Sequence, residues 1–337
     1  MKDKRFSLLE NENSTALKAQ GSSYEKEDKP HFSLLTKETE KAPEKIPFSR
    51  KLHYWLIENK ATFLHRTYGL KINYNNKKTI QYLLEVKCTG YKKGIFYYTL
   101  DRTRFFKDGK QLDRFMEQLA EQSVSCLYPL KVSVNKLGEI VSVTNQEEIE
   151  KRWQIKQKEL AKRYKGNPFI NYCQKISNSV SSSAKLLESL RNDVVYDILF
   201  SKLYINYSNK FTKPLEKEFK WFSGFKKVQF YGSQTVNPII KENKRILINY
   251  NGVMRPIGGL GTGETLVKYE LDSKDNSLLR VDGLFNYTQN NVNETIEFKA
   301  IWQKSMDKTI AQQIAYEKRK GIYFDPDAEK KWYEFWK

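Results

Sequence analysis

Stretches of strand-like alternation lie on both sides of a helical middle, and this order constrains the fold most. Between residues 78 and 88, Ile80, Tyr82, Leu84 and Val86 share one face of an extended chain, in a strict period of two. The pattern predicts strands within 62–106, a helix at 111–124, a hairpin at 128–145, helices within 146–207 and further strands within 219–302.

Hairpin-connected strands with helices inserted between them are typical of α+β proteins with antiparallel sheets. We therefore expect one curved antiparallel sheet or partial barrel over residues 49–304, with the central helices packed on one side. Residues 305–337 are predicted to be a helical, aromatic and charged C-terminal segment. The alternative is two domains that divide near residue 210.

The hairpin and the helix after it give the clearest local prediction. The segment 130–134 alternates, Gly138 lies in a turn where a positive φ costs a glycine little, and the segment 140–143 leads back. Asn145 and Glu148 match the N-cap and N3 positions of a capping box. A helix is therefore predicted to begin at this point.

A tail of 48 residues precedes the body. Around two short apolar motifs it is rich in Lys, Glu and Ser and contains few apolar residues, which is typical of disorder. One phrase occurs twice in it: Arg5-Phe6-Ser7-Leu8-Leu9 is repeated as His31-Phe32-Ser33-Leu34-Leu35, and a Glu follows six positions after each Phe. Such apolar islands have no core to enter, so we expect them to dock a protein partner. The candidate docking residues are Phe6, Leu8, Leu9, Phe32, Leu34 and Leu35.

The formal net charge is +19, and the tail does not account for it. Residues 1–50 contain ten Lys or Arg and nine Asp or Glu, which leaves about +18 for the rest of the chain. Such a surface should bind nucleic acid weakly and without sequence preference at low salt. The candidate polyanion-binding residues are Lys156, Arg163, Lys220, Trp221 and Lys227. A solvated helix face around residues 147–165, or codon bias toward Lys, explains the same charges.

One glycine-rich stretch could hold a phosphate group. Its spacing matches no nucleotide-binding pattern, and a strand is predicted after it rather than a helix. We interpret it as a mobile loop between strands. The residues concerned are Arg255, Gly258, Gly259, Gly261 and Gly263.

The other chemistry-bearing residues show no catalytic or metal-ligating arrangement. Cys88, Cys126 and Cys173 are far apart in sequence, no His has a partner at a metal spacing, and Asp193 and Asp197 fit the polar flank of a helix. We therefore expect no catalytic site, cofactor or metal. No apolar run approaches the length of a membrane span, and free thiols indicate a reducing compartment, which favours the cytoplasm.

The hairpin also carries a resemblance to other proteins. Its residues are Val132-Ser133-Val134, followed by Gly138-Glu139-Ile140-Val141-Ser142-Val143-Thr144-Asn145 and a helix. This phrase looks like hypothetical bacterial proteins, some of which are accessory parts of contractile injection or type VI secretion clusters. The resemblance covers one hairpin and implies a role in such an apparatus.

Three functional hypotheses follow from the sequence. The first is a non-enzymatic adaptor or assembly protein that binds partners through its tail. The second is a nucleic-acid-binding protein with a basic, aromatic surface. The third is a small-ligand binder or enzyme that uses the concave face of the sheet.

Overall fold

The computed structural model describes residues 50–52, 56–110, 112, 114–219, 228–240, 244–254, 261–289 and 292–304. The strands are β1 Arg50–Lys51, β2 His65–Tyr74, β3 Lys78–Lys92, β4 Ile95–Lys107, β5 Leu130–Asn135, β6 Ile140–Val143, β7 Thr212–Phe219, β8 Val228–Val236, β9 Ile239–Ile240, β10 Arg245–Met254, β11 Thr262–Asp272, β12 Leu278–Gln289 and β13 Val292–Trp302. The helices are α1 Phe115–Val124, the 3-10 turn η1 Ser125–Leu127, α2 Gln146–Arg163, α3 Asn167–Val180, α4 Ser183–Arg191 and α5 Val194–Leu199.

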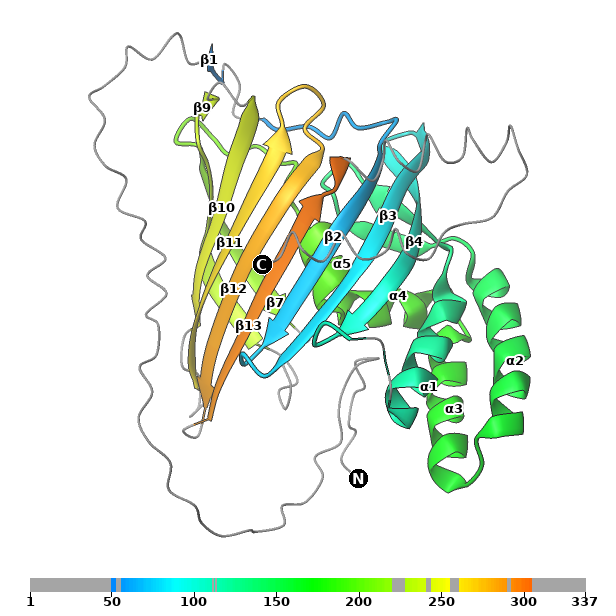
Figure 1. Cartoon of the computed structure of the whole chain (residues 1–337). Coiled ribbons are helices and arrows are strands. Elements are labelled where there is room, and N and C mark those ends of the chain that lie inside the picture. Colours follow the sequence, from blue (N-terminus) through cyan, green and yellow to red (C-terminus); the bar gives the residue numbers. More distant parts are fainter. Residues whose placement is uncertain are drawn as a thin grey trace, which may run out of the picture.

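Eleven of these strands form one sheet, in the order β6-β5-β4-β3-β2-β13-β12-β11-β10-β8-β7. Every neighbouring pair is antiparallel, and β2 pairs with β13, so strands from both ends of the chain meet in one sheet. The sheet curves strongly without closing (Figure 1). The predicted α+β fold with a curved antiparallel sheet is confirmed.

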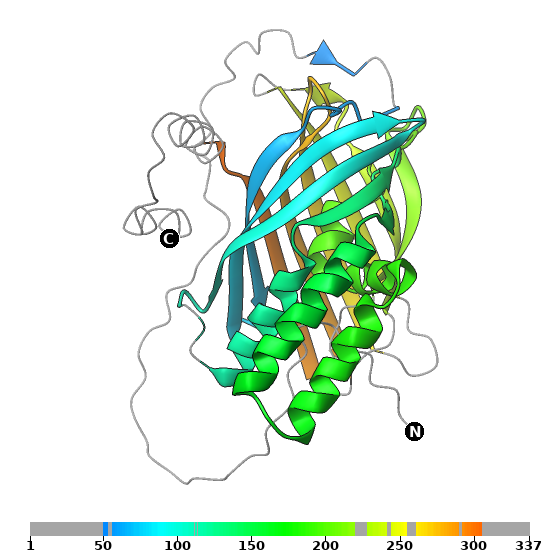
Figure 2. The same ribbon diagram turned by 90° about the vertical axis from the view of Figure 1, so that its right-hand side faces the viewer.

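The helices cover one side of this sheet, as predicted. In Figure 1, α5 lies within the concave side of the sheet, while α1, α2 and α3 stand beside it. Figure 2, turned by a quarter, shows α2 and α3 in front of the strands. Helix α5 therefore occupies part of the concave side of the sheet.

Alternation along the strands builds the core. Ile80, Tyr82, Leu84 and Val86 of β3 are all buried, as the period of two predicted. Fully burying a large apolar side chain contributes about 1.5–3 kcal/mol, so one such strand contributes a substantial part of the hydrophobic stabilisation. Gly138 adopts a φ of 101°, which confirms the predicted turn between β5 and β6.

Within 146–207, the leucine spacing after Ser183 predicts one helix that runs to about residue 207, and this prediction is wrong in its length. The chain instead forms α4 and α5, and the segment between α5 and β7 is not helical. Asp193 causes the break because its carboxylate accepts a hydrogen bond from the Val195 N–H at 2.8 Å and caps α5. The prediction that Asp193 lies on a polar helix flank is therefore wrong too.

The predicted capping box at Asn145 is also incorrect in its contacts. The Asn145 side chain makes no capping hydrogen bond to α2. It accepts a hydrogen bond from the Lys131 N–H at 2.9 Å and donates one to the Pro129 carbonyl at 2.9 Å. The residue thus ties the hairpin to the start of α2, and the helix still begins where the sequence predicted.

Strand β7 begins earlier than predicted, at Thr212 rather than near residue 219. Its inward residues are Leu215, Lys217 and Phe219, and the charged Lys217 interrupts the apolar alternation. Beyond β7, the strand predicted to run to residue 222 lies outside the described residues, as does the C-terminal segment predicted at 305–337.

Candidate functional site

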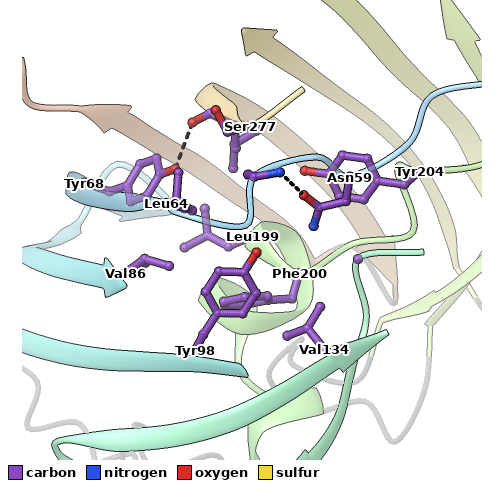
Figure 3. Close-up of a pocket in the computed structure, with 13 residues that line it drawn as sticks. Asn59, Leu64, Tyr68, Val86, Tyr98, Val134, Leu199, Phe200, Tyr204 and Ser277 are labelled. Carbon is purple, nitrogen blue, oxygen red and sulfur yellow. Dashed lines mark hydrogen bonds between the residues drawn. The ribbon is translucent and has the colours of Figure 1, made fainter. Parts of the chain in front are cut away.

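A cavity of about 50 Å³ lies where the start of β2 meets the concave side of the sheet. Its walls come from the segment before β2, from β3, β4 and β5, from the end of α5, and from the β11–β12 turn (Figure 3). Apolar side chains such as Leu64, Val86 and Phe200 provide most of the lining. Tyr68, Tyr98 and Tyr204 add hydroxyl groups at its edge.

The polar groups around this cavity already bond to the protein itself. The Tyr68 hydroxyl donates to the Leu278 carbonyl at 2.8 Å, and the Tyr204 hydroxyl donates to the Asn276 carbonyl at 3.1 Å. Asn59 accepts a hydrogen bond from the Ala61 N–H at 3.0 Å. Burial raises the pKa of Tyr98, so this phenol stays protonated. The polar groups serve to hold the walls together.

The size of the cavity limits what it can bind. A volume near 50 Å³ holds a few water molecules, whereas cofactor and drug-sized sites enclose about 300–1,000 Å³. A second cavity of about 20 Å³ lies between α2, α3 and α4, against Trp153. Neither cavity supports the hypothesis of an enzyme or a small-ligand binder.

Lys217 on β7 is an amine directed into the interior. Its Nζ donates a hydrogen bond to the Ser201 hydroxyl and lies 5.2 Å from the centre of the Tyr250 ring and 6.0 Å from that of Tyr269. Burial lowers the pKa of Lys217 to about 8, although Asp197 and Glu139 partly oppose this shift. An amine beside a hydroxyl can act as a base toward it, but neither cavity is lined by Lys217 or Ser201.

A second internal charge, Arg102, is compensated by its surroundings. Its guanidinium lies 5.0–5.5 Å from the ring centres of Tyr82, Phe105 and Tyr128 and pairs with Glu121 at 2.6 Å. Burial raises the pKa of Glu121, which its ion pair with Arg102 partly offsets. This cluster joins β4 to α1 and is structural.

The ends of three helices form an exposed apolar cluster. Phe115 and Met116 begin α1, and Phe169 and Ile170 lie in the first turn of α3; we call these four residues the helix-end patch. Phe115, Met116 and Ile170 are 55%, 56% and 58% exposed. Tyr164, at the end of α2, is buried beneath them, with its ring centre 4.5 Å from that of Phe115 and 5.9 Å from that of Phe169.

Of the predicted polyanion-binding residues, the structure describes Lys156 and Arg163, which lie seven positions apart on α2. Lys156 forms an ion pair with Glu159 at 2.6 Å, while Arg163 is exposed at the end of α2. Lys220, Trp221 and Lys227 lie outside the described residues. The Lys156–Glu159 pair is of the kind expected on a solvated helix face.

Of the glycine-rich stretch, two predicted residues can be placed. Gly261 directly precedes β11, and Gly263 lies within that strand, opposite Tyr287 of β12. Arg255, Gly258 and Gly259 lie outside the described residues, as do the six docking residues predicted in the tail.

The described residues contain no group of three or more His, Cys, Asp or Glu that could hold a metal ion. Cys88, Cys126 and Cys173 are buried free thiols. Among the helices in the described ranges, none combines the length and apolar character needed to cross a membrane.

The fold therefore defines an α+β protein built on a large, open antiparallel sheet. No family model matches the chain, and no curated protein matches it. Among solved structures, it is similar to a chain described as "Lipid-protein interactions in lipovitellin", with a TM-score of 0.40 and 9% sequence identity. The match covers 75% of this chain and 25% of that one, so this chain spans about a quarter of the length of its structural neighbour.

Proposed function

We propose that the protein is a non-enzymatic adaptor or assembly protein of a bacterial cytoplasm. It binds protein partners through the two Phe-Ser-Leu-Leu motifs of its tail, and the folded body serves as the platform that carries them. The resemblance of the hairpin at 132–145 to proteins of secretion clusters favours a contractile injection or secretion apparatus as the setting.

The observation that carries this proposal is the duplicated motif in an otherwise polar tail. Large apolar side chains in such a segment are used when a partner covers them. Two features of the body add support: α5 lies on the concave side of its sheet, and the two cavities described above are too small for a cofactor-sized ligand.

Partner capture from a native lysate tests the proposal. We expect the variant in which Phe6, Leu9, Phe32 and Leu35 are all replaced by Ala to fold normally and to lose its partners, because the four anchors of both motifs are gone. Quantitative mass spectrometry of proteins retained by the tagged full chain is the measurement. A matched control replaces Ser14, Thr15, Ser22 and Ser23 of the same tail with Ala. Recovery of the same partners by the quadruple variant would refute the docking role.

Nucleic-acid binding is a second candidate because Lys162, Arg163 and Lys165 are all exposed and form no ion pair among the described residues. We expect binding at low salt only, vanishing near ~150 mM salt without sequence preference, because scattered charges act through counterion release. Gel-shift titration of the full chain over a salt series measures this. A dissociation constant below about a micromolar at that salt, lost on Arg163→Ala or Trp221→Ala, would make nucleic-acid recognition the leading function.

A further inference from the structure

The helix-end patch is an apolar surface that remains exposed in the part of the chain that the structure describes. Phe115, Met116 and Ile170 are each more than half exposed, and the rings of Phe115 and Phe169 both pack on the buried ring of Tyr164. Solitary exposed apolar residues are common on protein surfaces, but a contiguous cluster of aromatic and long aliphatic side chains marks an interaction site. Phe and Met are also among the residues that protein interfaces favour.

Positive charge borders this patch. Arg114, Lys162, Arg163 and Lys165 lie within two positions of patch residues or of Tyr164, all are exposed, and none forms an ion pair among the described residues. Two acidic side chains near this border that the structure describes are already paired, Glu117 with Lys107 and Glu159 with Lys156. The amino-terminal turns of α1 and α3 both contact Tyr164 and neither has a side-chain cap, so the helix dipoles add partial positive charge. This surface is therefore complementary to a peptide segment in which apolar side chains are followed by carboxylates.

The first tail motif has this chemistry. Phe6 and Leu9 are three positions apart, a spacing that places both on one face of a helical turn, and Glu10 and Glu12 follow at once. An apolar helical face laid into an apolar groove is a common mode of peptide recognition. The motif therefore offers two anchors for the patch and two carboxylates for its basic border.

The length of the tail favours the first copy of the motif as the occupant of the patch. Strand β1, which begins at Arg50, and helices α1 and α3 lie at opposite ends of the molecule (Figures 1 and 2). Leu9 is 41 residues from Arg50, a tether that spans about 140 Å when extended and about 35 Å when relaxed. Leu35 is 15 residues away, which gives about 50 Å extended and about 20 Å relaxed.

We propose that the helix-end patch is a docking site for the first Phe-Ser-Leu-Leu motif of the same chain, residues Phe6–Leu9. The inference rests on the proposed docking role of the motifs and adds a regulation of it: a motif held on its own body is withheld from partners. A tether of this length supplies an effective concentration near the millimolar range, so a weak contact suffices. The second motif stays available for partner capture.

Photo-crosslinking of the full chain tests this proposal. Ser7, which lies between the anchors, is replaced by p-benzoylphenylalanine, and the crosslinked peptides are identified after digestion. We expect crosslinks from position 7 to the peptides around Phe115 and Ile170, at the mass of a single chain, with a yield that does not change when the protein is diluted tenfold. The same substitution at Ser33 should crosslink there much less, because its tether is shorter.

Variants of the patch make the test specific. Phe115→Ser combined with Ile170→Ser should lower the crosslink yield about tenfold, the effect of losing roughly 1.4 kcal/mol of contact. Ile155→Ser on α2 is the matched control, since Ile155 is 62% exposed but is not part of the patch, and it should leave the yield unchanged. Crosslinks to other surfaces, crosslinks only at the mass of two chains, or a yield insensitive to the patch variants would overturn the proposal.

The outcome is separate from that of the proposed function, because the crosslink requires no partner. Motif-dependent partner capture without the crosslink would refute self-docking alone. If the crosslink depends on the patch but the quadruple motif variant still captures the same partners, only the adaptor role is refuted.

Discussion

Replacing Gly232 with alanine is expected to destabilise the body by about 4 kcal/mol or more, enough to prevent folding in many proteins of this size. A Cβ atom at position 232 of β8 would lie 1.9 Å from the backbone oxygen of Asn251 and 2.7 Å from Gly252 Cα on β10. Both contacts are with backbone, which cannot rotate away, so β8 and β10 would have to separate. These two strands hold edge strand β7 and its residue Lys217 in place.

Urea unfolding followed by far-ultraviolet circular dichroism measures this effect. Gly90→Ala is the matched control, because a Cβ atom on this β3 residue would meet nothing nearer than Tyr97 at 4.0 Å. It should shift the free energy of unfolding by less than about 1 kcal/mol. Equal effects of the two substitutions would contradict the close pairing of β8 with β10.

Replacing Lys217 with methionine is expected to stabilise the protein at pH 7 and to remove part of its pH dependence. The pKa of Lys217 falls from 10.5 to about 8 on folding, because burial disfavours the ammonium form. Between pH 8 and 10.5 the unfolded chain therefore binds more protons than the folded protein, and the stability contributed by this residue rises with pH. Below pH 8 the folded state bears the full cost of the buried charge, about 3 kcal/mol.

The Lys217→Met variant loses this cost along with the hydrogen bond to Ser201, worth about 1 kcal/mol, so a net gain of roughly 2 kcal/mol at pH 7 is expected. The gain should shrink steadily from pH 8 to pH 9.5. Denaturant unfolding in this range measures it and avoids higher pH, where buried tyrosines such as Tyr269 ionise only in the unfolded chain and lower stability. Lys213→Met, at an exposed position of the same strand, should show neither effect. A gain independent of pH would contradict the buried amine.

Alternation was sufficient to predict the sheet wherever a strand buries one apolar face. The alternation at 78–88 lies in β3, and the strands predicted within 62–106 are β2, β3 and β4, because residues such as Ile80, Leu84 and Leu100 are buried in the apolar core. The start of β7 was not predicted, because the charged Lys217 occupies an inward position of the strand and interrupts the apolar alternation. Its charge is compensated by Ser201, by two tyrosine rings and by the nearby carboxylates of Asp197 and Glu139, most of which are distant in sequence.

The helical middle was predictable in its existence and less so in its details. Leu186 and Ile198 share the three- and four-residue spacing of one long helix, but that pattern does not show that the Asp193 carboxylate caps a new one. The helix-end patch could not be predicted, since Phe115 and Met116 have the spacing of a buried stripe and yet lie at a helix start that protrudes from the core. Only the packing of α1, α2 and α3 reveals which apolar residues remain exposed.

Titration of a captured partner against the full chain and its motif variants tests the adaptor role most directly. Because the first motif is held on the body and the second stays available, Phe32→Ala with Leu35→Ala should weaken binding by about 10²-fold, and Phe6→Ala with Leu9→Ala should weaken it less. The variant lacking all four anchors should show no measurable binding. A dissociation constant of the quadruple variant equal to that of the wild type would contradict the account, because the body alone would then hold the partner.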